Sequence, residues 1–212
     1  GHALALIMSL TRKVVWLNQQ VKEGSWAFDD ATPIHRFSPQ TVGLVSYGKI
    51  ARKLAAHLQA IGFSVIAYDP YVDKANIATD VELVSLEELM KRSDVISLHA
   101  PLVKETYQMI HKEMFDLAKP NAVLINTGRG AVVNEDDLIE ALQTGKISGA
   151  GLDVVEVEPI DEHHPFMTMD QVVLTPHVAF YSEESMQELK RKTAETIISV
   201  LKGEKPTYVV NE

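Results

Sequence analysis

The sequence predicts a doubly wound α/β fold with a mainly parallel sheet. Short apolar runs rich in β-branched residues alternate with segments whose apolar residues recur at helical spacing. The short runs are apolar on both faces, which is typical of parallel strands covered by helices on each side. The expected strands are Thr41–Val45, Ser64–Tyr68, Val81–Val84, Val95–Leu98, Ala122–Ile125, Gly151–Val155 and Val172–Leu174.

The segment before the first strand is expected to form a helix and an arm. The stretch Asn18–Gln40 is polar and contains proline, which favours an extended arm, and loops of this length usually have a role. We expect the helix and the arm to serve a twofold homodimer. Because Gly1 already lies inside the helical pattern, we expect the chain to be cut from a larger protein. The helix is predicted from the apolar spacing of Ala3, Ile7, Leu10, Val14 and Leu17.

Four later helices have recognisable end signals. Glycine in the left-handed conformation ends helices, and short polar side chains cap their first turns. The signals are Gly62 after the stripe Ile50–Ile61, the capping box Ser85–Glu88, Asn134 before three acidic residues, and Ser182 and Gly203 at the ends of the last helix.

Composition excludes several classes of protein. With 46% hydrophobic and 23% charged residues, the 212-residue chain is expected to fold around a core. The formal charge of −9 repels phosphate backbones and anionic lipids, so we expect no nucleic-acid or membrane partner. The absence of cysteine removes thiolate metal sites and cysteine nucleophiles and fits the cytoplasm. No targeting signal accompanies the short apolar run Ala3–Met8.

The turn after the first strand resembles a dinucleotide-binding fingerprint. Residues 42–51, VGLVSYGKIA, lead from the strand into a helix. On the pattern G-x-G-x-x-G/A they supply Ser46, Gly48 and Ala51. Gly48 takes the central position, where the backbone approaches a pyrophosphate, but Ser46 replaces the first glycine and its β-carbon is expected to crowd the turn. Alone, the pattern is equally consistent with a structural turn.

An acidic residue strengthens the dinucleotide interpretation. Asp69 follows Gly48 by 21 residues and ends the next strand. A carboxylate there accepts hydrogen bonds from the ribose hydroxyls of adenosine and repels the extra phosphate of NADP, which favours NAD. Asp69 also precedes Pro70, so a role in opening a turn is compatible with the functional one.

Other polar residues also follow strands, where open α/β sheets bind their ligands. Three motifs occur in order: NTGRGAVVNEDDL at 126–138, GAGLDVVEVEP at 149–159 and LTPHVAFYSEES at 174–185. With the fingerprint, they resemble the D-isomer-specific 2-hydroxyacid dehydrogenases over essentially the whole chain. The resemblance implies a Rossmann-type dinucleotide-binding domain over residues 1–182, and a C-terminal helix and tail over 183–212. The C-terminal helix and tail would pack on a substrate domain. Most of that domain, a segment of about a hundred residues, is missing from this chain.

The resemblance implies NAD-dependent, reversible reduction of a 2-keto acid to a D-2-hydroxy acid. Arg129 would bind the substrate's carboxylate and carbonyl, and His177 would donate and accept the proton. Glu158 would hold the imidazole and favour its protonated form, and Asp153 would accept from the nicotinamide carboxamide. The chemistry agrees, because hydride transfer places negative charge on the carbonyl oxygen, which needs a nearby cation and an acid.

The resemblance also implies the cofactor contacts. Lys49 and Ile50 would offer backbone amides to the pyrophosphate at a helix N-terminus. Val103 departs from the family, which often has threonine there, with little expected effect. The full set is Tyr47, Gly48, Lys49, Ile50, Asp69, Ala100, Pro101, Thr106, Thr127, Gly128, Arg129, Asp153, His177 and Ala179.

Several alternatives stay open. A NAD(H)-sensing, corepressor-like binding protein would keep the same architecture, and a methyltransferase using adenosylmethionine would explain Asp69 but not the ordered Arg, Glu and His. His99 ends a strand and is a second candidate for the base, although a packed histidine is the commoner case. His163 and His164 favour a solvated loop over a metal site, and we expect no metal. The remaining histidines, expected to be structural or exposed, are His2, His35, His57 and His111.

Overall fold

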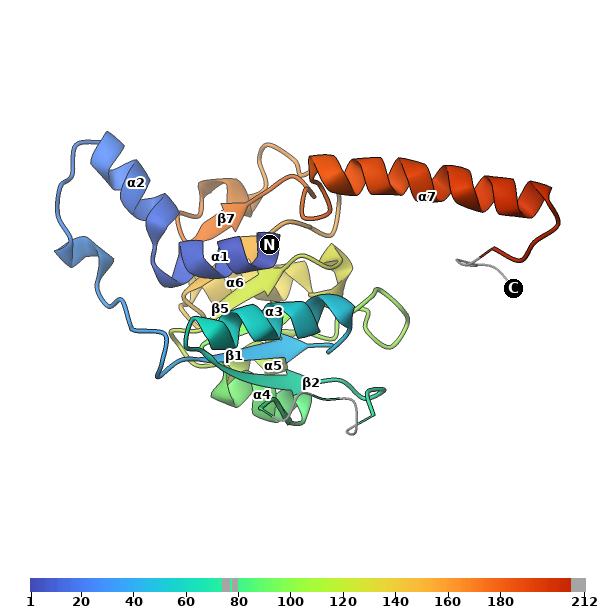
Figure 1. The fold of residues 1–212 in the computed structure, drawn as a ribbon. Coiled ribbons are helices and arrows are strands. Elements are labelled where there is room, and N and C mark those ends of the chain that lie inside the picture. The colour runs from blue at the N-terminus through green and yellow to red at the C-terminus, as the bar shows by residue number, and fades with distance from the viewer. Residues whose placement is uncertain (74–76, 78–79, 207–212) are drawn as a thin grey trace. The chain divides into compact units, whose positions relative to one another are not determined.

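The computed structural model describes residues 1–73, 77 and 80–206, and within them seven parallel strands form one sheet (Figure 1). Their order is β3-β2-β1-β4-β5-β6-β7, so the winding direction reverses between β1 and β4. Every neighbouring pair is parallel, which confirms the predicted doubly wound α/β fold. The strands are β1 Thr41–Val45, β2 Ser64–Tyr68, β3 Glu82–Leu83, β4 Val95–Leu98, β5 Val123–Asn126, β6 Gly149–Leu152 and β7 Val172–Leu174.

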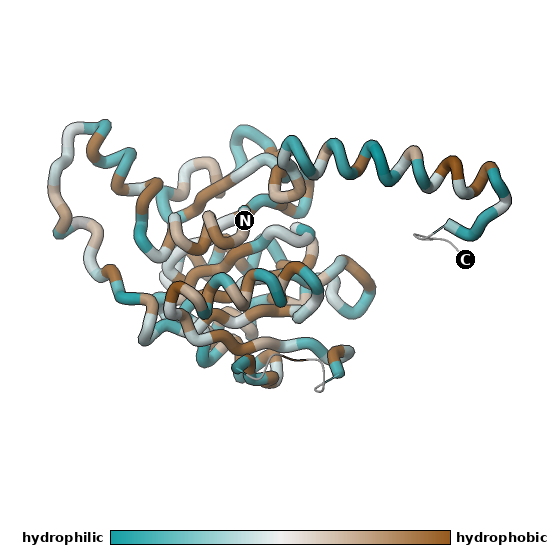
Figure 2. The backbone as a smooth tube through the Cα atoms, viewed as in Figure 1, coloured by the Kyte–Doolittle hydropathy of each residue, from teal (hydrophilic) through white to brown (hydrophobic). Residues whose placement is uncertain are grey.

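Helices cover both faces of the sheet and enclose two apolar cores. Helices α1 (His2–Thr11) and α3 (Lys49–Ala60) pack on one face. Helices α4 (Leu86–Arg92), α5 (Lys112–Leu117) and α6 (Glu135–Gln143) pack on the other. The central strands are buried along their length and are mostly hydrophobic in Figure 2. Burial on both faces explains why these strands lack an apolar–polar alternation.

The single N-terminal helix expected from the spacing is two helices, and that prediction is wrong. Lys13 adopts a left-handed conformation, with φ at 52°, between α1 and α2 (Val14–Lys22). The arm therefore becomes irregular only after Lys22 and not at Asn18. The apolar spacing continues across the break, so periodicity alone does not reveal a left-handed non-glycine residue.

Strand β6 begins two residues earlier than expected, at Gly149, and ends at Leu152. Glycine and alanine at its start lack the branched side chains that mark a strand in sequence. Small residues are needed because α1 lies close: a β-carbon on Gly151 would stand 3.1 Å from Leu10 and 3.2 Å from Leu6. Strand β3 is shorter than expected, and β5 is displaced by one residue.

The predicted helix-end residues are confirmed at their positions; of the reciprocal capping box expected for Ser85 and Glu88, the structure shows the bond from the Glu88 amide to Ser85. Gly62, with φ at 102°, follows α3, and Ser182 begins α7 (Glu183–Leu201) through reciprocal bonds with Ser185. Ser85 and Asn134 accept from amides of the first turns of α4 and α6. Contacts divide the chain into two units, Gly1–His177 and Val178–Glu212, and α7 lies in the second. None of the helices in the described ranges combines the length and apolarity needed to span a membrane.

Candidate active site

The turn after β1 combines a strained residue with the carboxylate at the end of β2. Ser46 has φ at 72°, a left-handed conformation that glycine adopts more easily. Its hydroxyl donates to Asp69 Oδ2 at 3.3 Å, and the Tyr47 amide donates to the same oxygen at 2.8 Å. The Tyr71 amide donates to Asp69 Oδ1 at 2.9 Å, so Asp69 does hold a turn. A carboxylate offers about four acceptor positions, which leaves this role compatible with a ribose contact.

The N-terminus of α3 fits a pyrophosphate. Gly48 is its N-cap, and within the described residues no side chain caps the first turn. A β-carbon on Gly48 would meet no atom within 4 Å, so the space beside the N-cap of the helix is open. Uncapped amides at a helix N-terminus form a ready site for an anion. The Tyr47 side chain is buried, with the Arg52 guanidinium 4.8 Å from its ring centre, so only its backbone faces this turn.

The loop after β4 is held by its own hydrogen bonds. Thr106 Oγ1 accepts from the Val103 amide at 2.9 Å and donates to the Pro101 carbonyl at 2.5 Å. Val103 thus contributes its backbone, which agrees with the small effect expected of its side chain. Ala100 is buried at the end of the strand.

His99 is unsuited to donate a proton. Its side chain is partly buried, and Nε2 lies 3.0 Å from Oγ of the buried Ser97. Desolvation by burial lowers the pKa of His99 to about 4, so the ring is neutral near pH 7. His99 is therefore a packed histidine, the commoner of the two interpretations.

The loops after β5 and β6 meet backbone to backbone. Buried Asn126 accepts from the Gly128 amide and donates to the Arg129 carbonyl, both at 3.0 Å. A β-carbon on Gly130 would stand 1.9 Å from the Val155 carbonyl oxygen, so only glycine fits. Arg129 is exposed, and its Nη1 donates to the Gly128 carbonyl at 2.7 Å. The arginine is thus fixed at its backbone beside the loop that leads to Glu158.

Glu158 and His177 form a hydrogen-bonded pair. His177 Nδ1 lies 2.6 Å from Glu158 Oε2, and the Val155 amide donates to Glu158 Oε1 at 3.2 Å. The His177 backbone is left-handed, with φ at 52°, and its amide donates to the Asp153 carbonyl at 2.8 Å. Both partners are partly open to solvent, with side-chain exposures of 43% for His177 and 36% for Glu158. The bond to Nδ1 fixes the ring and directs Nε2 away from the carboxylate.

An apolar cavity of about 590 Å³ adjoins this pair. This volume is within the range of small-molecule sites. Its polar lining consists of Asp153, Glu158, Thr175 and His177. The apolar lining includes Ile160, Met167, Leu174 and Pro176.

Asp153 is buried and bonded to Thr175, a residue of the motif at 174–185 to which the sequence analysis assigned no role. Thr175 Oγ1 donates to Asp153 Oδ1 at 2.5 Å. His2 Nε2, from α1, lies 2.9 Å from Thr175 Oγ1 and 3.3 Å from Asp153 Oδ1. His2 precedes Thr175 by 173 residues, so no local pattern points to this contact.

The remaining predicted site residues lie apart from this cluster or in the second unit. Thr127 follows β5, and Ala179 belongs to the unit that begins at Val178. His164 Nε2 bonds to Glu135 at 3.0 Å, while His163 is exposed. In the described part of the chain, three or more potential metal ligands do not gather anywhere.

We predict that His99 lowers the free energy of unfolding as the pH falls from 6.5 to about 4. In that pH range the unfolded chain binds a proton at His99 and the folded chain does not. The loss between pH 7 and pH 5 should be about 2 kcal/mol. His99→Gln, which keeps a donor toward Ser97, should flatten this part of the profile. Urea unfolding of the unsubstituted protein and of His99→Gln at pH 7 and pH 5 measures this loss, because all other groups are the same in the two proteins. An equal loss of unfolding free energy in both proteins would contradict the prediction.

The comparisons with known proteins agree with the motifs. A family model described as D-isomer specific 2-hydroxyacid dehydrogenase, NAD binding domain, matches residues 4–179. Glyoxylate reductase from Thermofilum pendens is 37% identical over 215 residues, covering 99% of this chain and 63% of that protein. Hydroxypyruvate reductase from Blautia hydrogenotrophica is 35% identical over 216 residues, covering 99% and 66%. The chain thus spans just under two thirds of the length of these relatives.

Solved structures show the same arrangement. The crystal structure of D-lactate dehydrogenase with NAD+ from Lactobacillus jensenii matches with a TM-score of 0.89 and 29% sequence identity. The match covers 99% of this chain and 67% of that chain. The resemblance inferred from the ordered motifs is confirmed.

Proposed function

The chain belongs to the D-isomer specific 2-hydroxyacid dehydrogenase family and contains the family's NAD-binding domain, and on this basis we propose a function for the whole protein. It reversibly reduces a 2-keto acid to a D-2-hydroxy acid. The observation that carries the proposal is the 2.6 Å bond between His177 Nδ1 and Glu158 Oε2 beside the Arg129 loop. The relatives are named as reductases and dehydrogenases, which favours a catalytic oxidoreductase over the corepressor-like and methyltransferase alternatives.

His177 is suited to proton transfer at the substrate's carbonyl oxygen. Glu158 holds Nδ1, so Nε2 is the nitrogen that gives the proton during reduction and takes it back during oxidation. Because Glu158 is itself bonded to the Val155 amide, the ring keeps a fixed orientation. Pre-set orientation of this kind lowers the cost of reaching the transition state.

Arg129 is the cation of the site. Its planar guanidinium matches the two oxygens of a carboxylate and stays charged at working pH. Such a charge also stabilises the negative charge that develops on the carbonyl oxygen. The contact of Gly130 with Val155 ties the Arg129 loop to the Glu158 loop, so the cation and the acid–base pair keep their relative places.

The described residues fit NAD. NADH, when bound, supplies the hydride. The open N-terminus of α3 would hold the pyrophosphate, Asp69 would accept from the adenosine ribose, and the buried Asp153 would accept from the nicotinamide carboxamide. The absence of cysteine supports a reducing compartment, and we place the protein in the cytoplasm.

We predict that His177→Ala in the full-length protein lowers kcat by about 10²- to 10⁴-fold, the usual contribution of a general acid–base group. NADH binding should be retained, because the pyrophosphate and adenosine contacts lie on β1, α3 and β2. Steady-state kinetics with a 2-keto acid and calorimetric titration with NADH measure the two effects. His57→Ala, an exposed histidine on α3, is the control, and an unchanged kcat in His177→Ala would exclude the assignment.

Asp69 is expected to select NAD over NADP. Asp69→Asn keeps an acceptor for the Tyr47 amide but removes the negative charge. The ratio of NADH affinity to NADPH affinity should fall by about tenfold. Repulsion between the Asp69 carboxylate and the extra phosphate of NADPH, at about 4 Å, amounts to about 1 kcal/mol in water and more near a protein surface. Side-by-side calorimetric titrations measure the ratio; an unaltered ratio would contradict this role.

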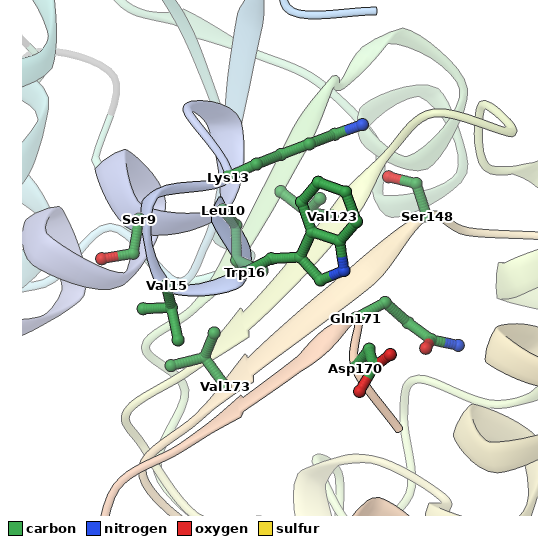
Figure 3. Close-up of a pocket in the computed structure, with 10 residues that line it drawn as sticks. All are labelled: Ser9, Leu10, Lys13, Val15, Trp16, Val123, Ser148, Asp170, Gln171 and Val173. Atoms are coloured by element: carbon green, nitrogen blue, oxygen red, sulfur yellow. The ribbon is translucent and has the colours of Figure 1, made fainter. Parts of the chain in front are cut away.

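A twofold homodimer through α2 and the arm is also part of the proposal. Trp26 and Phe28 are 89% and 79% exposed, and Val14, Val15 and Val21 of α2 are exposed as well. Clustered apolar side chains of this kind mark interaction surfaces. Beside α2, a pocket of about 300 Å³ lies at the amino ends of β5, β6 and β7 (Figure 3). Its lining includes Lys13, Trp16, Ser148, Asp170 and Gln171.

We predict that replacing both Trp26 and Phe28 with serine shifts the full-length protein from dimer toward monomer, since both rings lose the apolar surface that a partner would bury. Sedimentation velocity over a range of concentrations measures the shift. Tyr71→Ser, at another exposed aromatic residue, serves as the control. A dimer as stable as that of the unsubstituted protein would argue against the arm.

A further inference from the structure

We propose that His2 is a positioning residue for the nicotinamide end of the site, acting through Thr175 on Asp153. The inference rests on the proposed function, which assigns Asp153 to the nicotinamide carboxamide. Its basis is the three-residue cluster of His2, Thr175 and Asp153, which joins the first turn of α1 to the loops after β6 and β7.

The hydrogen-bond directions in the cluster follow from the number of protons available. The Thr175 hydroxyl has one proton, and the 2.5 Å bond gives it to Asp153 Oδ1. The Thr175 oxygen is therefore the acceptor in its 2.9 Å contact with His2, and His2 Nε2 is the donor. The same nitrogen lies 3.3 Å from Asp153 Oδ1. His2 thus directs an N–H toward both members of the pair.

Burial makes this donor important. The Asp153 side chain has no solvent exposure, whereas 25% of the His2 side chain is exposed. A buried carboxylate needs hydrogen bonds in place of water, and removal of a donor leaves part of that need unmet. The carboxylate then loses one of the contacts that set its direction.

The close packing of α1 brings His2 within reach of this cluster. Leu6 and Leu10 of α1 lie over Gly151, where any β-carbon would be only 3.1 to 3.2 Å from them. Ala3 and Ile7 are buried in the same interface. Because Gly149 and Gly151 present no side chain to α1, the helix lies close to the sheet, with its first turn beside the end of the strand.

Asp153 also connects the cluster to the acid–base residue. Its backbone carbonyl accepts from the His177 amide at 2.8 Å, two residues beyond Thr175. One residue therefore has its side chain held by Thr175 and His2 and its main chain bonded to His177. We expect His2 to influence where the nicotinamide lies relative to His177, without touching substrate.

The test separates the nicotinamide end of the cofactor from the rest. ADP-ribose contains the adenine, both riboses and the pyrophosphate of NADH but lacks the nicotinamide. Calorimetric titrations of the full-length protein with NADH and with ADP-ribose are compared for the unsubstituted protein, His2→Ala, His2→Gln and His57→Ala. His57 is an exposed histidine on α3 whose Nδ1 bonds to the Lys53 carbonyl of its own helix.

His2→Ala should weaken NADH binding by about three- to tenfold, the range of one hydrogen bond, and leave ADP-ribose binding unchanged. His2→Gln, which returns an N–H donor, should restore most of the NADH affinity, and His57→Ala should alter neither ligand. Thr175→Val should reproduce the loss, and the double variant His2→Ala with Thr175→Val should lose no more than either single variant, because both act on one network.

Equal NADH affinity in His2→Ala and the unsubstituted protein would overturn the inference and leave the proposed function intact. Equal losses for NADH and ADP-ribose would also overturn it, because they would show a general disturbance of the domain. If the unsubstituted protein bound neither NADH nor ADP-ribose, or bound both with the same low affinity, both the proposed function and the inference would be contradicted.

Discussion

The buried carboxylate of Asp153 is the constraint around which the carboxyl end of the sheet is arranged. A carboxyl group without solvent exposure needs hydrogen-bond partners in place of water, and these partners come from separate parts of the chain. Thr175 follows β7, and His2 begins α1. The backbone of Asp153 adds a bond to Asn126 at the end of β5 and another to His177. Through its side chain and its main chain together, one residue thus connects the ends of β5, β6 and β7 and the first turn of α1.

Glycine permits the close approaches that this arrangement requires. Gly151 lets α1 lie directly on β6, and Gly130 lets the loop of Arg129 lie against the backbone of Val155. Neither contact leaves room for a β-carbon without displacement of a neighbour, and at Gly130 the neighbour is main chain. The proposed cation Arg129 and the proposed acid–base pair Glu158 and His177 have exposed side chains, but the backbone that carries them is closely packed. Rigid support beneath exposed side chains is what a catalytic constellation needs.

The features that could be predicted from the sequence are those encoded locally. Buried strands, helix caps at Ser85, Asn134 and Ser182, and polar residues after strands all follow from short patterns, and parallel pairing then brings the polar residues to one end of the sheet. The break at Lys13 is a left-handed conformation at a non-glycine residue, which the apolar spacing does not reveal. The early start of β6 depends on how α1 packs, which no short window contains. The contact of His2 with Thr175 spans nearly the whole chain, so the residue could be read only as structural or exposed.

The bonds of Asp69 to Ser46 and Tyr47 have a consequence for how this protein can change over evolutionary time. The carboxylate at the ribose position is also a structural support of the turn that precedes α3, where a serine stands in a left-handed conformation. In a turn with glycine at that position, the acidic residue would be exchangeable with less effect on the backbone. In this chain the proposed cofactor preference and the stability of the turn depend on the same carboxylate, so a lineage that replaces Asp69 in favour of NADP also changes the support of the left-handed Ser46.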